Sequence, residues 1–143
     1  MSYDPILPEH LDTPRTRRRE PVSWPVVVGF GALALLWPLV DALAVADALG
    51  QPATALAVLA IVGLAWVLGA GFGRVPRPIL TLTLAGVVYG VILVALSLLL
   101  DVRPAFDGRL GAAVAVVEIA RSAGLGALAG LLAAALQRTL AAR

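Results

Sequence analysis

Residues 53–72 have the sequence ATALAVLAIVGLAWVLGAGF, an apolar run without a single charged side chain. At ~1.5 Å of rise per residue, a helix of about 20 residues crosses the ~30 Å hydrocarbon core of a bilayer. A strand of a membrane barrel would instead alternate apolar and polar side chains over about ten residues. This run is apolar on all sides, so it predicts a transmembrane helix.

Three other segments have the same character. The first covers residues 24–49 and contains Pro38, which predicts a kink near residues 35–41. The third covers residues 79–100, and the fourth covers residues 110–136. The sequence therefore predicts an all-α, polytopic integral membrane protein, an up-down bundle of four transmembrane helices.

The remaining residues divide the chain into two parts. Residues 1–22 are polar, contain four prolines and show no helical or strand periodicity, so they predict a flexible cytoplasmic tail. Residues 23–143 form the predicted membrane domain. A cleaved signal peptide is the alternative for the first apolar segment, but this segment is long and three further apolar segments follow it.

Composition excludes several classes of function. The chain is 60% hydrophobic and 14% charged, whereas soluble domains are about half apolar and about a quarter charged. It has no cysteine, and its one histidine, His10, lies in the polar tail, so thiolate and histidine-rich metal sites are excluded and no cofactor is predicted. Net charge is only +2, and the arginines mostly flank apolar segments, which argues against nucleic-acid binding.

Arginine placement predicts the orientation. All eleven basic residues are arginine, and the bias toward alanine, leucine, valine and glycine is typical of a GC-rich bacterial genome. Because arginine-rich loops stay in the cytoplasm, we expect a multi-pass protein of the bacterial plasma (inner) membrane with both termini cytoplasmic. One side collects Arg15, Arg17, Arg18, Arg19, Arg74, Arg77, Arg138 and Arg143, and the other has Arg103 and Arg109, near Asp41, Asp47, Asp101 and Asp107.

Three ionisable residues within the predicted spans form the candidate polar site: Asp41, Glu118 and Arg121. Charges inside a bilayer are costly, by ~2.5–3.5 kcal/mol on insertion scales, so they need partners or water. Helix rise places them at a similar level, ~22–27 Å from the inner ends of their helices. An up-down bundle usually places its first helix beside its fourth. We therefore expect Arg121 to bridge Glu118 and Asp41, as a structural pair or as a site for an ion, proton or small solute.

Small residues at four-residue spacing predict close helix packing. Lipid tails provide no hydrophobic drive for helix association, so helices associate where small side chains let the backbones approach. The pattern predicts packing within the bundle, and an interface with a second copy or another membrane protein is the alternative. The predicted packing residues are Gly69, Gly73, Gly86, Gly90, Gly126 and Gly130.

No catalytic constellation is visible in the sequence. The apolar segments contain no histidine, cysteine or lysine, and an arginine beside Glu118 would keep that carboxylate ionised. The leading expectation is thus a non-enzymatic accessory or interaction subunit, with the lipid bilayer, a second copy or a membrane protein as partner. The alternative is an oligomeric transporter or channel for a small solute or ion. A cavity lined by the three charged residues and reaching the midplane would favour the transporter.

Overall fold

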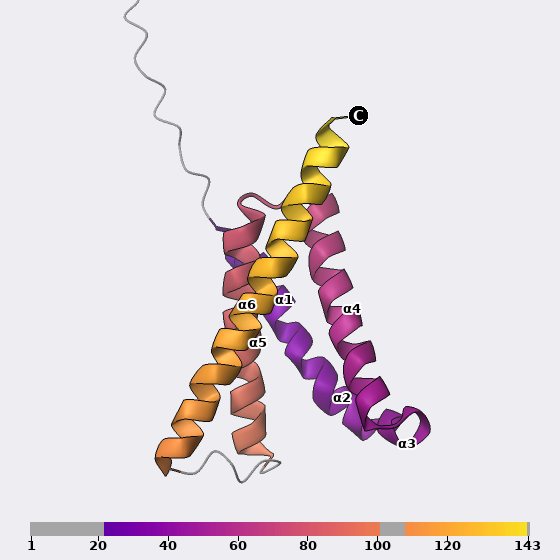
Figure 1. The fold of residues 1–143 in the computed structure, drawn as a ribbon, viewed down its shortest axis with the longest axis vertical. Coiled ribbons are helices and arrows are strands. Elements are labelled where there is room, and N and C mark those ends of the chain that lie inside the picture. Colours follow the sequence, from indigo (N-terminus) through magenta and orange to yellow (C-terminus); the bar gives the residue numbers. More distant parts are fainter. Residues whose placement is uncertain (1–21, 101–107, 143) are drawn as a thin grey trace, which may run out of the picture.

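The computed structural model describes residues 22–100 and 108–142, and this part of the chain is helical without any strand. Four stretches are long and apolar enough to cross a membrane: Trp24–Ala42, Gln51–Phe72, Pro78–Leu99 and Leu110–Ala141. The predicted four-helix membrane architecture is confirmed. Most of the predicted tail and of the loop before the last helix lies outside the described residues. The elements in chain order are α1 (Trp24–Gly31), a 3-10 turn (Ala32–Leu35), α2 (Leu36–Ala42), α3 (Val45–Leu49), α4 (Gln51–Phe72), α5 (Pro78–Leu99) and α6 (Gly108–Ala141) (Figure 1).

The first span is interrupted one turn before Pro38. A proline ring removes one backbone donor and clashes with the carbonyl of the residue four positions earlier, here Ala34. The chain adopts 3-10 geometry over Ala32–Leu35, where that clash falls. The span also ends earlier than predicted, because Ala44 takes a left-handed conformation (φ +51°) that a right-handed helix excludes. The short helix α3 then leads to α4.

The other three spans begin close to their predicted residues. Pro78 opens α5 in the first turn, where its missing N–H costs nothing. The last helix continues to Ala141, beyond the predicted end at residue 136. Gln137 contributes to this extension, because its Nε2 donates to the carbonyls of Ala70 (2.9 Å) and Val75 (3.2 Å) and so holds the end of α6 against the α4–α5 connection.

The closest helix pair is α5 with α6, and glycines form its seam. A Cβ built on Gly86 would overlap the backbone carbonyl of Ser122, and one built on Gly126 would overlap that of Leu82. A Cβ on Gly90 would lie 2.9 Å from the Cα of Ile119, and a Cβ on Gly130 would lie 2.6 Å from the Cα of Ile79, at the two ends of the seam. All four predicted glycines of these helices therefore face the other helix of the pair, within one chain.

The two predicted glycines of α4 have different positions. A Cβ on Gly69 would lie 2.8 Å from the ring of Phe30, so this glycine lets α1 approach α4. Gly73 caps the end of α4, and the nearest atom to an added Cβ would be the carbonyl oxygen of Gly69 on the same helix. Gly73 thus serves the helix end and not a contact between helices.

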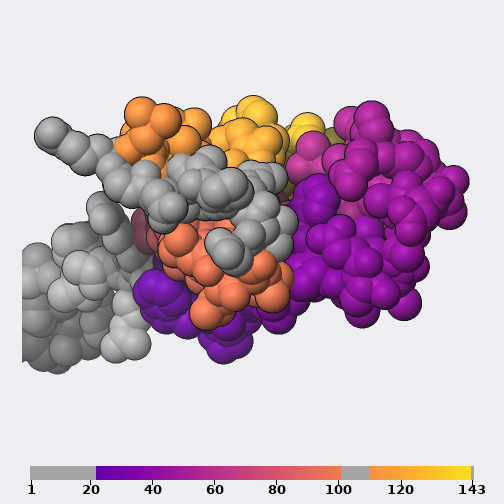
Figure 2. Space-filling view, turned by 90° about the horizontal axis from the view of Figure 1, so that it is seen from below, coloured from indigo at the N-terminus to yellow at the C-terminus, as the bar shows by residue number. Residues whose placement is uncertain are grey.

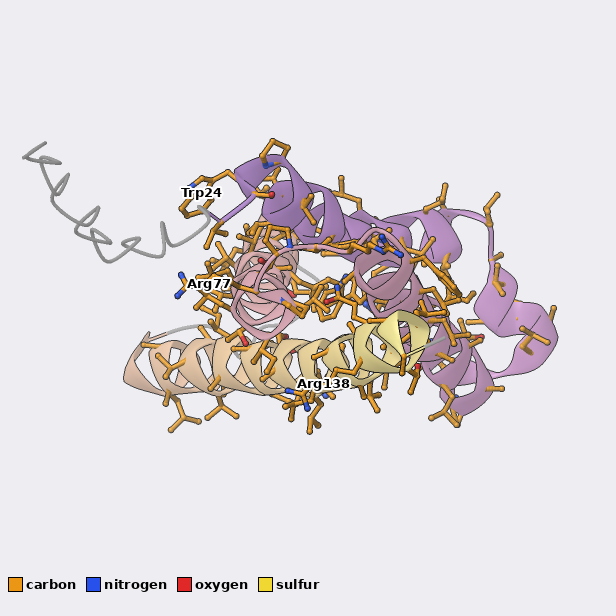
Figure 3. The ribbon with its side chains drawn as sticks, turned by 90° about the horizontal axis from the view of Figure 1, so that it is seen from above. Trp24, Arg77 and Arg138 are labelled. Carbon is orange, nitrogen blue, oxygen red and sulfur yellow. The ribbon has the colours of Figure 1, made fainter. Side chains whose placement is uncertain are left out.

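The neighbours of the helices within the bundle differ from those expected. Viewed from the end that carries Trp24, Arg77 and Arg138, the α1–α2 span lies on one face, α4 and α5 lie in the middle, and α6 lies on the other face (Figure 3). The span α1 packs against α5, and α6 packs against α5 and α4. The expectation that the first and last spans lie side by side is therefore wrong, because the glycine seam places α5 between them.

Candidate functional site

A cavity of about 900 Å³ lies between α2, α4, α5 and α6. Its lining starts at Ala55 on α4 and Leu100 at the end of α5. Figure 2 views the molecule from this end. Lining residues on α4 run from Ala55 to Val67, so the cavity extends ~18 Å along that helix, past its midpoint. Beyond Val67 the helices close, since Ala70 is fully buried and its carbonyl is bonded by Gln137.

The three charged residues singled out in the sequence all line this cavity. Arg121 donates to Glu118 over 2.6 Å, three residues earlier on α6. The Glu118 side chain is 17% exposed and that of Arg121 is 64% exposed, so the carboxylate lies against the protein while the guanidinium reaches outward. Asp41 enters from α2 and is exposed.

The expected bridge between Arg121 and Asp41 is not formed. Among the described residues, the only ion pair within 4.0 Å is Arg121 with Glu118. The reason is the helix order: α2 is bonded to α5 through Trp37 and Tyr89, whereas α6 lies on the opposite face of the bundle (Figure 3). Asp41 and Arg121 thus face one cavity without contact, and the described lining carries two carboxylates and one guanidinium.

An aromatic cluster forms the inner part of the cavity, and sequence reasoning missed it. Trp37 Nε1 donates to the Tyr89 hydroxyl over 2.8 Å, a bond between residues 52 positions apart. The rings of Trp66 and Tyr89 meet edge to face, with centroids 5.6 Å apart and planes at 85°. Trp66 Nε1 donates to the Phe30 carbonyl over 3.1 Å. The available signal was the presence of polar-tipped aromatic residues deep inside apolar segments, where each N–H or O–H needs a partner.

The cluster includes one hydroxyl, that of Tyr89, among the residues that line the cavity. The Tyr89 hydroxyl accepts the Trp37 bond, and within the described part of the chain no acceptor binds its own proton. Ser97 and Ser122 are the hydroxyl side chains that also line the wall, and Ser122 is buried against α5. Leucine, valine and alanine side chains provide most of the remaining lining. The site therefore combines an apolar enclosure with a small set of convergent polar groups, as ligand pockets do.

The described residues contain no group of three or more histidine, aspartate or glutamate side chains placed to hold a metal ion. In comparisons with known proteins, no protein-family model, curated protein or solved structure matches the chain.

Proposed function

We propose that this chain is a non-enzymatic protein of the bacterial plasma membrane that binds a small amphipathic organic cation in the cavity, as the binding step of a carrier. The observation that carries the proposal is a 900 Å³ cavity with apolar walls, in which the charged groups of the described lining sum to one negative charge. A cavity lined by Asp41, Glu118 and Arg121 and reaching past the midpoint of α4 favours solute binding over a purely accessory role.

The charge of the ligand follows from the pairing of the lining residues. Arg121 is already neutralised by Glu118 at 2.6 Å, so it has little attraction left for an anion. Asp41 has no cationic partner within 4.0 Å among the described residues. A carboxylate beside apolar walls attracts a cation that also loses water readily, which describes an organic cation better than a metal ion.

The aromatic cluster supports the same ligand class. The faces of tryptophan and tyrosine rings attract cations through their quadrupole, by ~0.5–2 kcal/mol depending on desolvation. Trp37, Trp66 and Tyr89 all line the cavity. The Trp37–Tyr89 hydrogen bond and the edge-to-face contact of Trp66 with Tyr89 hold the rings in place before any ligand arrives. A rigid wall of this kind reduces the ordering cost of binding.

The orientation of the chain in the membrane decides from which side the cavity is reached. The end with Trp24, Arg77 and Arg138 (Figure 3) has the character of a cytoplasmic end, because arginine-rich loops stay inside. The cavity begins at the opposite end. The proposed site is then reached from the outer side of the membrane or laterally from the outer leaflet, with both termini of the chain in the cytoplasm.

Two probes of the same shape and opposite charge test the proposal. Purified protein in nanodiscs of zwitterionic lipid is titrated with tetraphenylphosphonium and with tetraphenylborate, with empty nanodiscs as the reference. We expect saturable binding of the cation, quenching of tryptophan fluorescence and no saturable binding of the anion. Equal binding of both ions would show that partition into lipid, and not the cavity, explains the signal.

Substitution of Asp41 identifies the site. Asp41→Asn should weaken cation binding by on the order of ten-fold, which corresponds to ~1.4 kcal/mol. The matched control is Asp47→Asn, which removes the same charge from α3, outside the cavity lining, and should leave affinity unchanged. Equal effects of the two substitutions would contradict the proposal. Absence of binding together with a membrane protein that co-purifies and occupies the cavity would support the accessory role instead.

A further inference from the structure

A second groove lies at the opposite end of the molecule, between the start of α5 and the end of α6. It has a volume of about 650 Å³ and is separate from the solute cavity, with which it shares no lining residue. Figure 3 labels two of its side chains: Arg77, the residue directly before α5, and Arg138, in the last turn of α6. We call it the arginine groove, and its lining is Arg77, Pro78, Ile79, Leu80, Thr83, Ala134, Gln137, Arg138 and Ala141.

The charge at this end of the bundle has one sign. Among the described residues, the charged side chains here are Arg74, Arg77 and Arg138, all exposed. The described carboxylates, Asp41, Asp47 and Glu118, belong to α2, α3 and the first half of α6, toward the other end. No described carboxylate forms an ion pair with Arg77 or Arg138. Two guanidinium groups lining one groove favour a ligand with phosphate chemistry, which guanidinium binds in a fork-like geometry.

The wall below the arginines is apolar. Ile79 is 42% and Leu80 is 43% exposed, and Ala134 adds a small side chain on α6. The one hydroxyl of the wall, that of Thr83, already donates to the Ile79 carbonyl over 2.7 Å, so it needs no acceptor from a ligand. A ligand that fits the whole groove needs an anionic head and an apolar tail parallel to the helices.

The groove is built by the fold and not by flexible surface side chains alone. At its floor the helices touch, because an added Cβ on Gly130 would lie 2.6 Å from the Cα of Ile79. At its rim Gln137 ties α6 to the α4–α5 connection through the carbonyls of Ala70 and Val75. The two walls are thus held at a fixed separation before a ligand binds.

We propose that the arginine groove binds one anionic phospholipid, with its phosphate at the end that carries Arg77 and Arg138 and an acyl chain along Ile79 and Leu80. The position of the groove at the arginine-rich end matches the leaflet whose anionic lipids attract basic residues near the surface, by ~1 kcal/mol each. This lipid site does not depend on the proposed function of the solute cavity.

Native mass spectrometry of the full chain tests the site with defined lipids. Delipidated protein in detergent is titrated with phosphatidylglycerol and, separately, with phosphatidylcholine of the same acyl chains. We expect one phosphatidylglycerol to bind at least ten-fold more tightly than phosphatidylcholine. Glycerol phosphate, which has the head without the tail, should compete only at concentrations far above that of the lipid. Complete competition by it at equal concentration would show that the head alone binds and would overturn the lipid assignment.

Three substitutions of the same kind locate the lipid. Arg77→Gln and Arg138→Gln should each lower phosphatidylglycerol affinity by about ten-fold or more. Arg138→Lys keeps the charge and should retain part of the affinity that Arg138→Gln loses. Arg74→Gln removes an identical charge from the same end but from outside the groove lining, so affinity should change by less than about three-fold. All three side chains are exposed, and circular dichroism checks that each variant is folded. An effect of Arg74→Gln as large as that of Arg138→Gln would overturn the proposal.

Discussion

Alanine at Gly126 is the sharpest test of the packing that organises this bundle. A Cβ at this position would overlap the backbone carbonyl oxygen of Leu82 and lie 3.0 Å from the carbonyl carbon, which no rotamer change can relieve. It would also lie 3.3 Å from the Cα of Gly86. The helices α5 and α6 would have to move apart, and the contacts at the other seam glycines would loosen with them.

The magnitude follows from a comparison with a neighbouring glycine. Gly124 lies on the same helix, and an added Cβ there would meet nothing within 4 Å. Both substitutions gain up to ~1 kcal/mol of helix propensity, so this gain cancels in the comparison. Overpacking of a tight contact costs ~1–3 kcal/mol. We therefore expect Gly126→Ala to be less stable than Gly124→Ala by ~1–3 kcal/mol.

Unfolding by sodium dodecyl sulfate in mixed micelles, followed by circular dichroism, measures both variants under identical conditions. A third variant, Leu82→Ala combined with Gly126→Ala, tests whether the clash is with the backbone or with the side chain of Leu82. It should not recover the stability lost in Gly126→Ala, because the clash is with the carbonyl of Leu82. If the two alanine variants agree within about 0.5 kcal/mol, or if Leu82→Ala restores the stability lost at Gly126, the close approach of the two backbones is refuted.

Two further predictions concern bonds that join distant parts of the chain. Tyr89→Phe keeps the ring against Trp66 but leaves the Trp37 donor without its acceptor, which should lower the free energy of unfolding by ~1–3 kcal/mol. In a Trp37→Phe background the same substitution should cost almost nothing, and an unchanged cost would contradict the role of the bond. Gln137→Ala should speed amide hydrogen exchange in residues 73–77 and cost a similar amount, whereas Gln51→Ala, at the exposed start of α4, should do neither. Gln137→Glu lacks the donor and should match the alanine variant, so wild-type exchange in it would refute this assignment.

The candidate site was only partly predictable. The spacing of Glu118 and Arg121, three residues apart on one helix, places their side chains within reach of each other whatever surrounds them. Helix rise also places Asp41 at a similar level of the membrane. What rise cannot specify is the rotation and neighbour of each helix, and for this reason the expected bridge to Asp41 failed although all three residues line one cavity.

Four apolar spans, a disturbance of the first span by Pro38 and five of the six packing glycines follow from the residues alone. These features depend on the length of apolar runs, on the chemistry of a proline ring and on the absence of a side chain, all of which are local. The folded chain adds that α5 lies between α1 and α6, that Trp37 meets Tyr89, and that α2, α4, α5 and α6 enclose a cavity. None of this could be predicted, because helices apolar on every side carry no amphipathic stripe to point at a neighbour. Their order in lipid is set by the fit of one surface against another.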